Sequence, residues 1–140
     1  YKGGVPALLA LLGGNLSLMI ENMPLALPYR KPGRVRALAV SGLRRASMLP
    51  EVPTLDESGL RGYQVIGWNA LFVPAATPRG IVDRLNGEAV KALALLDVKE
   101  RLAGLGIEAV GNTPEQAAAF VKAETAKWSK VVRDSGMKVE

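Results

Sequence analysis

Cysteine and histidine are both absent from the 140 residues of this chain. Without cysteine there is no disulfide, no thiolate metal site and no cysteine nucleophile. Without histidine the chain lacks the usual general base near neutral pH and the commonest metal ligand, and no Ser-His or Cys-His relay can form. Most hydrolase and metalloenzyme chemistry is therefore disfavoured, and we expect no catalytic residue, no metal and no cofactor.

Long apolar runs are also missing. The longest, at residues 8–12 and 92–96, are far shorter than the roughly 18 residues of a membrane helix. Tyr1 is not a start methionine and no leader-like segment follows it, so we expect a processed or partial product. Hydrophobic residues are 49% and charged residues 22%, which is typical of a globular chain. The length suits one ordinary domain or pieces of two small ones.

The net charge of +5 is unevenly distributed along the chain. No acidic residue lies between Asn22 and Pro50, whereas the same stretch holds six basic residues: Arg30, Lys31, Arg34, Arg36, Arg44 and Arg45. Such a cluster is typical of a module that binds nucleic acid or an anionic surface. The more ordinary interpretation is a solvated face around helix ends and turns, because prolines and a glycine interrupt the cluster. Only Tyr29 interleaves the cluster, so a base-stacking platform is not supported and no nucleic-acid partner is expected.

Apolar periodicity and turn residues predict helices at 6–12 and 24–31 and strands at 16–20 and 35–40. Helix and strand alternating in this way are typical of a parallel α/β sheet. Residues 43–63 are rich in proline and glycine and predict a connecting segment. Residues 64–73 predict a long extended strand that crosses from one structural unit to another.

The remainder of the chain predicts helices at 78–92, 97–104 and 114–134 and a brief strand at 107–110. Asp97 with Glu100, and Thr113 with Gln116, have the spacing of capping boxes. These helices are of the kind that packs on a sheet, yet they supply few strands themselves. Neither half of the chain looks complete by itself.

A series of short motifs resembles one known family, the solute receptors of tripartite tricarboxylate transporters, also called Bug proteins. In order they are Tyr1-Lys2-Gly3-Gly4, Ala7-Leu8, Leu11–Gly14, Met19–Asn22, Leu38–Ser41, Leu49–Thr54, Glu57–Gly59, Trp68 with Leu71–Pro74, Arg84–Asn86, Arg101-Leu102, Thr113–Glu115 and Glu124 with Trp128. Each motif is short, but their order and spacing over the whole chain are specific.

The resemblance implies a portion of a periplasmic binding protein with two α/β lobes joined by a double crossover. Residues 1–62 would be the later part of the second lobe, 63–74 the crossover or hinge strand, and 75–140 the C-terminal helices of the first lobe. Such receptors are not enzymes; they capture small carboxylates or dicarboxylates in the periplasm and deliver them to a membrane permease. The earlier half of a receptor has no counterpart here, so we expect the incomplete lobes to favour a homodimer or a domain-swapped dimer.

Ligands of parallel sheets bind at the carboxyl ends of the strands. By the resemblance, Tyr1, Gly3 and Gly4 occupy one such end, where glycine lets a ligand approach the backbone and the first turn of the next helix suits a carboxylate. The alternative is a tight turn without a ligand.

Glu21 and Asn22 follow the next predicted strand. Asn22 is able to donate to a carboxylate, or to cap the helix after it. Glu21 repels an anion and is suited to a ligand ammonium or a water; the family more often has aspartate here. Trp68 and Asn69 lie on the crossover strand and border the cleft, unless Trp68 packs into a core. An enzyme would depend on Glu21 alone, because no second carboxylate is spaced to join it.

The sequence therefore predicts a truncated receptor for a small carboxylate. The alternative is a basic module that binds nucleic acid or an anionic surface through Arg30–Arg45.

Overall fold

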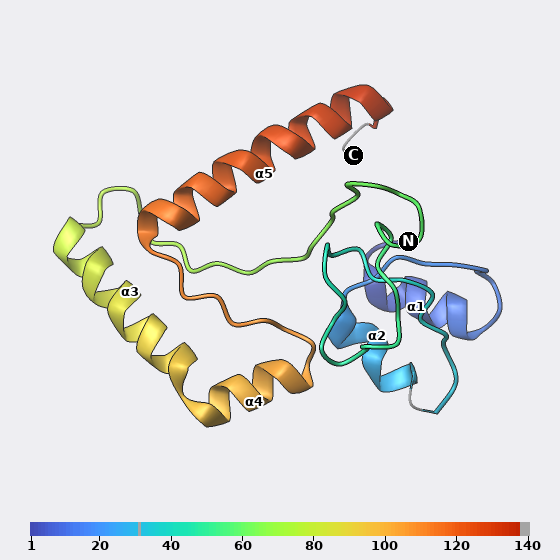
Figure 1. Cartoon of the computed structure of the whole chain (residues 1–140). Coiled ribbons are helices and arrows are strands. Elements are labelled where there is room, and N and C mark those ends of the chain that lie inside the picture. Colours follow the sequence, from blue (N-terminus) through green and yellow to red (C-terminus); the bar gives the residue numbers. More distant parts are fainter. Residues whose placement is uncertain (31, 138–140) are drawn as a thin grey trace. The chain divides into compact units, whose positions relative to one another are not determined.

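The computed structural model describes residues 1–30 and 32–137, and within them the regular elements are α-helices (Figure 1). They are α1 (Gly4–Leu12), α2 (Met23–Arg30), α3 (Arg79–Ala94), α4 (Leu96–Gly104) and α5 (Pro114–Ser135). Each corresponds to a helix predicted from the sequence. Every described helix is too short or too polar to cross a membrane.

Local chemistry explains where α5 begins and ends. The Thr113 hydroxyl accepts a hydrogen bond from the Gln116 N–H at 3.2 Å, and the Gln116 side chain accepts one from the Thr113 N–H at 2.9 Å. This reciprocal pair is the predicted capping box, with Pro114 at the first helical position. At the other end, Gly136 has a φ of 67°, a left-handed conformation that stops the helix at low cost.

The prediction of a second capping box, formed by Asp97 and Glu100, is wrong. Only Leu95 separates α3 from α4, and its extended backbone gives way to helix again at Leu96. Asp97 therefore lies inside the first turn of α4 and not at its cap, and in the described structure its side chain makes no hydrogen bond to Glu100. Its negative charge still lies at the favourable end of the helix dipole.

The strands predicted at 16–20, 35–40, 64–73 and 107–110 are also not formed: over the described range these segments are extended but build no ladder. A single isolated parallel bridge joins Val40 to Thr54. Its hydrogen bonds run from the Val40 N–H to the Pro53 carbonyl and from the Leu55 N–H to the Val40 carbonyl, each 2.9 Å long.

The physical reason is that these segments lack partner strands. A strand is stable only when another strand satisfies its backbone groups along its length. In the described residues these segments make only isolated backbone contacts with distant segments, Val40 with Pro53 and Leu55, and Val65 with Ser41. Residues of 17–19 and of 34–38 line a shared hollow of about 280 Å³. Their apolar side chains remain exposed: Leu18 at 64%, Ile20 at 75% and Leu38 at 61%.

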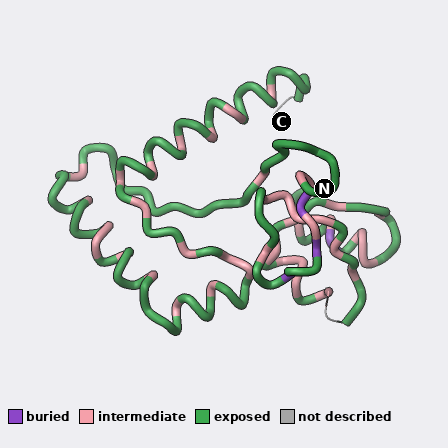
Figure 2. Tube along the Cα trace, viewed as in Figure 1, coloured by how far each residue is buried: buried purple, intermediate pink, exposed green. Residues whose placement is uncertain are grey.

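The chain divides into two compact units. The first consists of Tyr1–Asn69 and Leu96–Ala109, and the second of Ala70–Leu95 and the residues from Val110 onward. In the first unit the buried residues are few, namely Leu8, Leu49, Val52 and Thr54 (Figure 2). Gly106 lies against Met23 and Leu27 of α2, so the segment after α4 packs on that helix.

In the second unit, α3 packs against α5. Arg79 links them, since its guanidinium pairs with Asp83 one turn along α3, at 2.7 Å, and with Glu115 in the first turn of α5. The Asn86 side chain donates to the Asn112 carbonyl at 2.9 Å and ties α3 to the segment before α5.

Candidate functional site

The turn that opens α1 lies against the carboxylate of Glu21. A Cβ atom on Gly4 would lie 2.9 Å from the Glu21 Cδ and 3.0 Å from a Leu25 methyl, and it would clash with a carboxylate oxygen. Glycine at this position therefore lets the Glu21 carboxylate lie directly against the turn. Gly3 precedes it with a φ of 103°, which glycine adopts readily and other residues rarely do. The first turn of α1 has neither a side-chain cap nor an acidic residue of its own.

Asn22 connects this turn to a distant part of the first unit. Its backbone N–H donates to Glu21 Oε1 at 2.7 Å, and its Nδ2 donates to the same oxygen at 3.4 Å. Its side-chain oxygen lies against Gly67, where an added Cβ would be 3.4 Å from the Asn22 Cγ and would clash with Oδ1. At the start of α2, the backbone carbonyl of Asn22 accepts hydrogen bonds from the Leu25 and Ala26 N–H groups. The Asn22 side chain does not cap this helix.

A pair of hydrogen bonds holds the segment that carries Gly67 in place. The Val65 N–H donates to the Ser41 carbonyl at 2.9 Å, and the Ser41 hydroxyl donates to the Val65 carbonyl at 2.7 Å. Ser41 ends the second predicted strand, so the ends of three extended segments converge in the first unit.

Three of the seven predicted site residues therefore come together directly: Gly4, Glu21 and Asn22. Trp68 and Asn69 follow Gly67 in the chain and are exposed, Trp68 at 39%. Tyr1 is 74% exposed and, among the described residues, shares no hydrogen bond with this group. Their part in ligand binding stays a prediction.

Gly67 and Ser41 were not among the site residues predicted from the sequence. Gly67 had a usable signal, because a glycine inside a predicted strand often marks a close approach of another group to the backbone. Ser41 had none that distinguishes it from an ordinary strand end.

Glu21 lacks a basic partner anywhere in the part of the chain that the structure describes. Its Oε1 accepts from Asn22, whereas its Oε2 takes part in no hydrogen bond there. The described residues also contain no group of three or more acidic side chains that could hold a metal ion. The arrangement is therefore a small polar cluster with one free carboxylate oxygen.

By contrast, half of the six residues of the basic cluster pair with an acidic side chain. Arg30 pairs with Glu51, Arg44 with Glu108 at 3.4 Å and Arg45 with Glu57 at 2.9 Å, while Arg34 lies over the Tyr29 ring at 5.8 Å. Lys31 lies outside the described residues. These partners favour the solvated-face interpretation of the cluster over a surface for nucleic acid.

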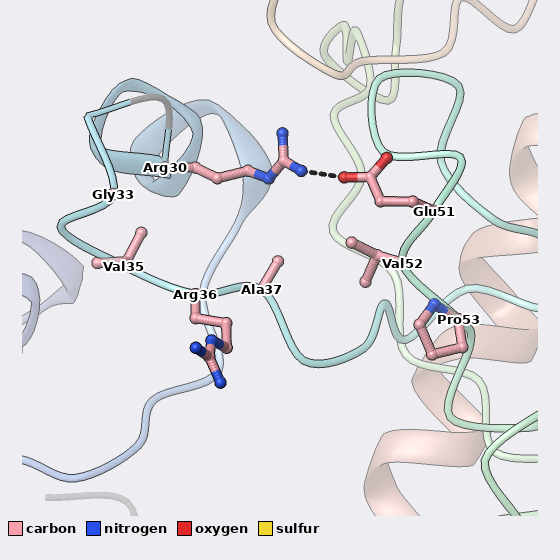
Figure 3. Close-up of a pocket in the computed structure, with 8 residues that line it drawn as sticks. All are labelled: Arg30, Gly33, Val35, Arg36, Ala37, Glu51, Val52 and Pro53. Atoms are coloured by element: carbon pink, nitrogen blue, oxygen red, sulfur yellow. Dashed lines mark hydrogen bonds and ion pairs between the residues drawn. The ribbon is translucent and has the colours of Figure 1, made fainter.

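Figure 3 shows the hollow of about 660 Å³ that this cluster borders. The Arg30–Glu51 ion pair lies on one side of it, and the Arg36 guanidinium points away from that pair. Within residues 1–30 and 32–137, Arg36 has no acidic partner. The hollow is therefore bordered by an ion pair whose two charges cancel, and not by a row of unpaired cations.

The chain is similar to known proteins both in sequence and in structure. The family model described as "Tripartite tricarboxylate transporter family receptor" matches residues 1–137. A UPF0065 protein from the tcbD-tcbE intergenic region of Pseudomonas sp. strain P51 is 43% identical over 133 residues, which are 94% of this chain and 40% of that protein.

Two solved structures share the course of the backbone. R. palustris Rpa4515 with adipate is 34% identical with a TM-score of 0.86, over 97% of this chain and 46% of that one. The periplasmic binding protein BugD is 34% identical with a TM-score of 0.85, over 100% of this chain and 48% of that one. The chain thus spans less than half the length of each of these relatives, and the matches include its extended segments as well as its helices.

Proposed function

Because the chain belongs to the receptor family of tripartite tricarboxylate transporters, a family of periplasmic solute-binding proteins, we propose that it is part of a receptor that captures a small carboxylate or dicarboxylate. The observation that carries the proposal is the convergence of Gly4, Glu21, Asn22 and Gly67 in one unit of the fold. A relative with 34% identity was solved with adipate, a dicarboxylate, which supports the ligand class.

The proposed site works by binding alone. The uncapped first turn of α1 offers backbone N–H groups to a carboxylate. The open space beside Gly3 leaves room for the ligand to approach them, whereas the Glu21 carboxylate already lies against Gly4. The Asn22 amide supplies a further donor. Tyr1, Trp68 and Asn69 border the same cluster along the chain and complete the proposed set of ligand contacts. No bond of the ligand is made or broken, so the proposal includes no catalytic step.

The whole receptor would act in the periplasm and deliver its ligand to the permease of a tripartite tricarboxylate transporter. In that assembly residues 1–62 would belong to the second α/β lobe, 63–74 to the crossover, and 75–140 to the first lobe. The support is family membership together with the share of about half of each solved relative that this chain covers.

A homodimer, with or without domain swapping, is the proposed state of this chain by itself. Its motivation is the exposure of apolar side chains on extended segments, Leu71, Ile20 and Phe72 above all. Light scattering across a wide concentration range tests it. A mass that rises toward twice 14.8 kDa supports the dimer, and a constant monomer mass contradicts it.

Thermal unfolding of the 140-residue chain tests the binding function. Mono-, di- and tricarboxylates, with adipate among them, are added in turn and unfolding is followed by tryptophan fluorescence. A ligand present at about 100 times its Kd adds roughly 2.7 kcal/mol to the free energy of unfolding. We expect one carboxylate to raise Tm, and we expect Asn22→Ala to remove that shift.

Asn15→Ala is the matched control, since Asn15 is an exposed asparagine of the same unit outside the cluster. A cooperative transition that no carboxylate shifts would overturn the proposed function.

A further inference from the structure

The extended segment at residues 64–67 is attached to the first unit through Ser41. The Ser41 carbonyl accepts a hydrogen bond from the Val65 N–H at 2.9 Å, and the Ser41 hydroxyl donates one to the Val65 carbonyl at 2.7 Å. Within residues 1–30 and 32–137, the backbone of residues 64–67 makes hydrogen bonds to Ser41 and to no other residue. A side-chain hydroxyl thus takes the place that a backbone N–H would have in a ladder, and it fixes the register of this segment.

Ser41 is a firm point of attachment because the residue before it is tied to the core. Val40 bridges to Thr54, which is only 1% exposed. The hydrogen bond from the Ser41 hydroxyl is itself half-buried. Loss of the hydroxyl would leave the Val65 carbonyl without its donor in this half-buried position, which is costly.

The register of the segment decides what lies against Asn22. Side chains of an extended chain alternate, so that Val65 and Gly67 share one face while Ile66 and Trp68 share the other. Gly67 lies against the Asn22 side chain, where an added Cβ would clash with Oδ1 and lie 3.4 Å from Cγ. A slip of one residue would bring Ile66 or Trp68 to this place. Neither fits where a single Cβ already clashes.

We propose that Ser41 is a positioning residue for carboxylate capture, which acts through Val65 and Gly67 on the side-chain amide of Asn22. The inference rests on the proposed function and adds a residue that does not itself touch the carboxylate. Its effect depends on how the amide is turned. The missing Cβ of Gly67 would lie 4.0 Å from Asn22 Nδ2, farther than from the oxygen, so the amide oxygen faces this segment and the nitrogen lies beyond it. The amide therefore keeps its donor, and not its acceptor, for an anion.

The energetic consequence concerns order and not charge. With the segment fixed by Ser41, the Asn22 amide is held in one orientation before a carboxylate arrives. When the Ser41 hydroxyl is removed, the segment is free to shift, and binding has to order both the segment and the amide. The affinity for a carboxylate then falls even while the chain remains folded.

Three variants of the 140-residue chain test the inference: Ser41→Ala, Ser41→Thr and Ser47→Ala. Binding of acetate, adipate and citrate is measured by titration calorimetry at a temperature where each variant is folded. For the carboxylate that the unmodified chain binds best, we expect Ser41→Ala to weaken binding about five- to tenfold. Ser41→Thr keeps the hydroxyl and should restore the affinity to within about twofold. Ser47→Ala is the matched control, because Ser47 is an exposed serine of the same unit, and it should change nothing.

Trp68 supplies a second measurement that needs no ligand, because it lies three residues after Val65. In a Trp128→Phe background, the emission of Trp68 should shift in Ser41→Ala and stay unchanged in Ser47→Ala. A hydroxyl with a merely structural role would lower Tm without altering the affinity of the folded chain. If Ser41→Ala does not fold, Ser41→Cys replaces it, since a thiol is a weak donor.

The inference requires both changes. If the unmodified chain binds a carboxylate and Ser41→Ala keeps either the affinity or the Trp68 emission, the inference is overturned and the proposed function stands. Failure of Ser41→Thr to restore the affinity would also overturn it, because the hydroxyl would then not be the active group. Absence of binding of all three carboxylates to the unmodified chain would overturn the proposed function and the inference together.

Discussion

The side chains of Thr54 and Glu57 each accept a hydrogen bond from the other residue's backbone N–H. The Thr54 N–H donates to Glu57 Oε2 at 2.8 Å, and the Glu57 N–H donates to the Thr54 hydroxyl at 3.0 Å. Arg45 holds the same carboxylate at 2.9 Å. Thr54 is only 1% exposed and also bridges to Val40, so this reciprocal pair fixes the proline-rich connecting segment to the core of the first unit.

The first prediction concerns acid stability. The hydrogen bond from the Thr54 N–H, followed by those from Arg45, lowers the pKa of Glu57 below its ordinary 4.5. Because the folded state favours the charged form, this stabilisation is complete above the unfolded pKa and is lost as the pH falls through the folded one. We expect Glu57→Gln to be less stable than the unmodified chain at pH 7 and to lose less stability between pH 7 and pH 3.

Urea unfolding at a series of pH values measures this difference, with Trp68 as the reporter in the first unit. Glu100→Gln serves as the control, since the described structure gives Glu100 no ionic partner. Parallel pH profiles for Glu57→Gln and the unmodified chain would contradict the prediction.

The second prediction compares two glycines of one segment. Gly106 has a φ of 72°, and a Cβ there would lie 2.6 Å from the Met23 Cε. Gly106→Ala is expected to lower the free energy of unfolding by about 1–2 kcal/mol, because alanine is strained in the left-handed region and Met23 must move. Gly104→Ala, at the end of α4 in open space, should be neutral or stabilising. Equal effects of the two substitutions in urea unfolding would show that this packing is unimportant.

The third prediction concerns Gly67 and the proposed site. A Cβ at this position would displace the side chain of Asn22, so Gly67→Ala should abolish the Tm shift caused by a bound carboxylate. Gly87→Ala is the control: Gly87 lies inside α3 with nothing near its missing Cβ, and the substitution should stabilise the chain by about 0.5–1 kcal/mol. A carboxylate shift that survives in Gly67→Ala would remove Asn22 from the site.

The fourth prediction uses Trp128 as a local pH probe. Its indole Nε1 donates to Glu124 Oε2 at 3.1 Å, and Lys127 donates to Oε1 at 2.5 Å. The Lys127 hydrogen bond, with that of Trp128, lowers the pKa of Glu124 below its ordinary 4.5. In a Trp68→Phe background, Trp128 emission should titrate below pH 4.5.

Glu124→Gln should abolish that step, because the titrating group is gone. A step with the same midpoint in Glu124→Gln would assign the titration to another group.

Much of the helical structure could be predicted from the sequence, because its determinants are local. Proline near the start of α1, the Thr113–Gln116 capping box and the glycine after α5 act within a few residues of the helix they bound. Asp97 shows the limit of such patterns. The same spacing as that of Thr113 did not make a cap, since α4 had already begun at Leu96.

The candidate site was predicted in part. Glu21 and Gly4 were each selected as neighbours of strand ends, but the sequence does not encode their contact in any local pattern. Gly67 lies more than forty residues from Asn22, and only the folded chain brings them together.

The sequence by itself determined the family, the exclusion of cysteine and histidine chemistry, and the helices, whose hydrogen bonds close within four residues along the chain. The tertiary structure decided what depends on distant neighbours. Apolar runs at 16–20 and 35–40 have the composition of strands, but a ladder needs a second backbone at hydrogen-bonding distance along its length. Within the described residues only Val40, at the end of the second run, has one, in its isolated bridge to Thr54. For the same reason Glu21 became a free acceptor beside the α1 turn: its partners depend on which segments the fold brings near it.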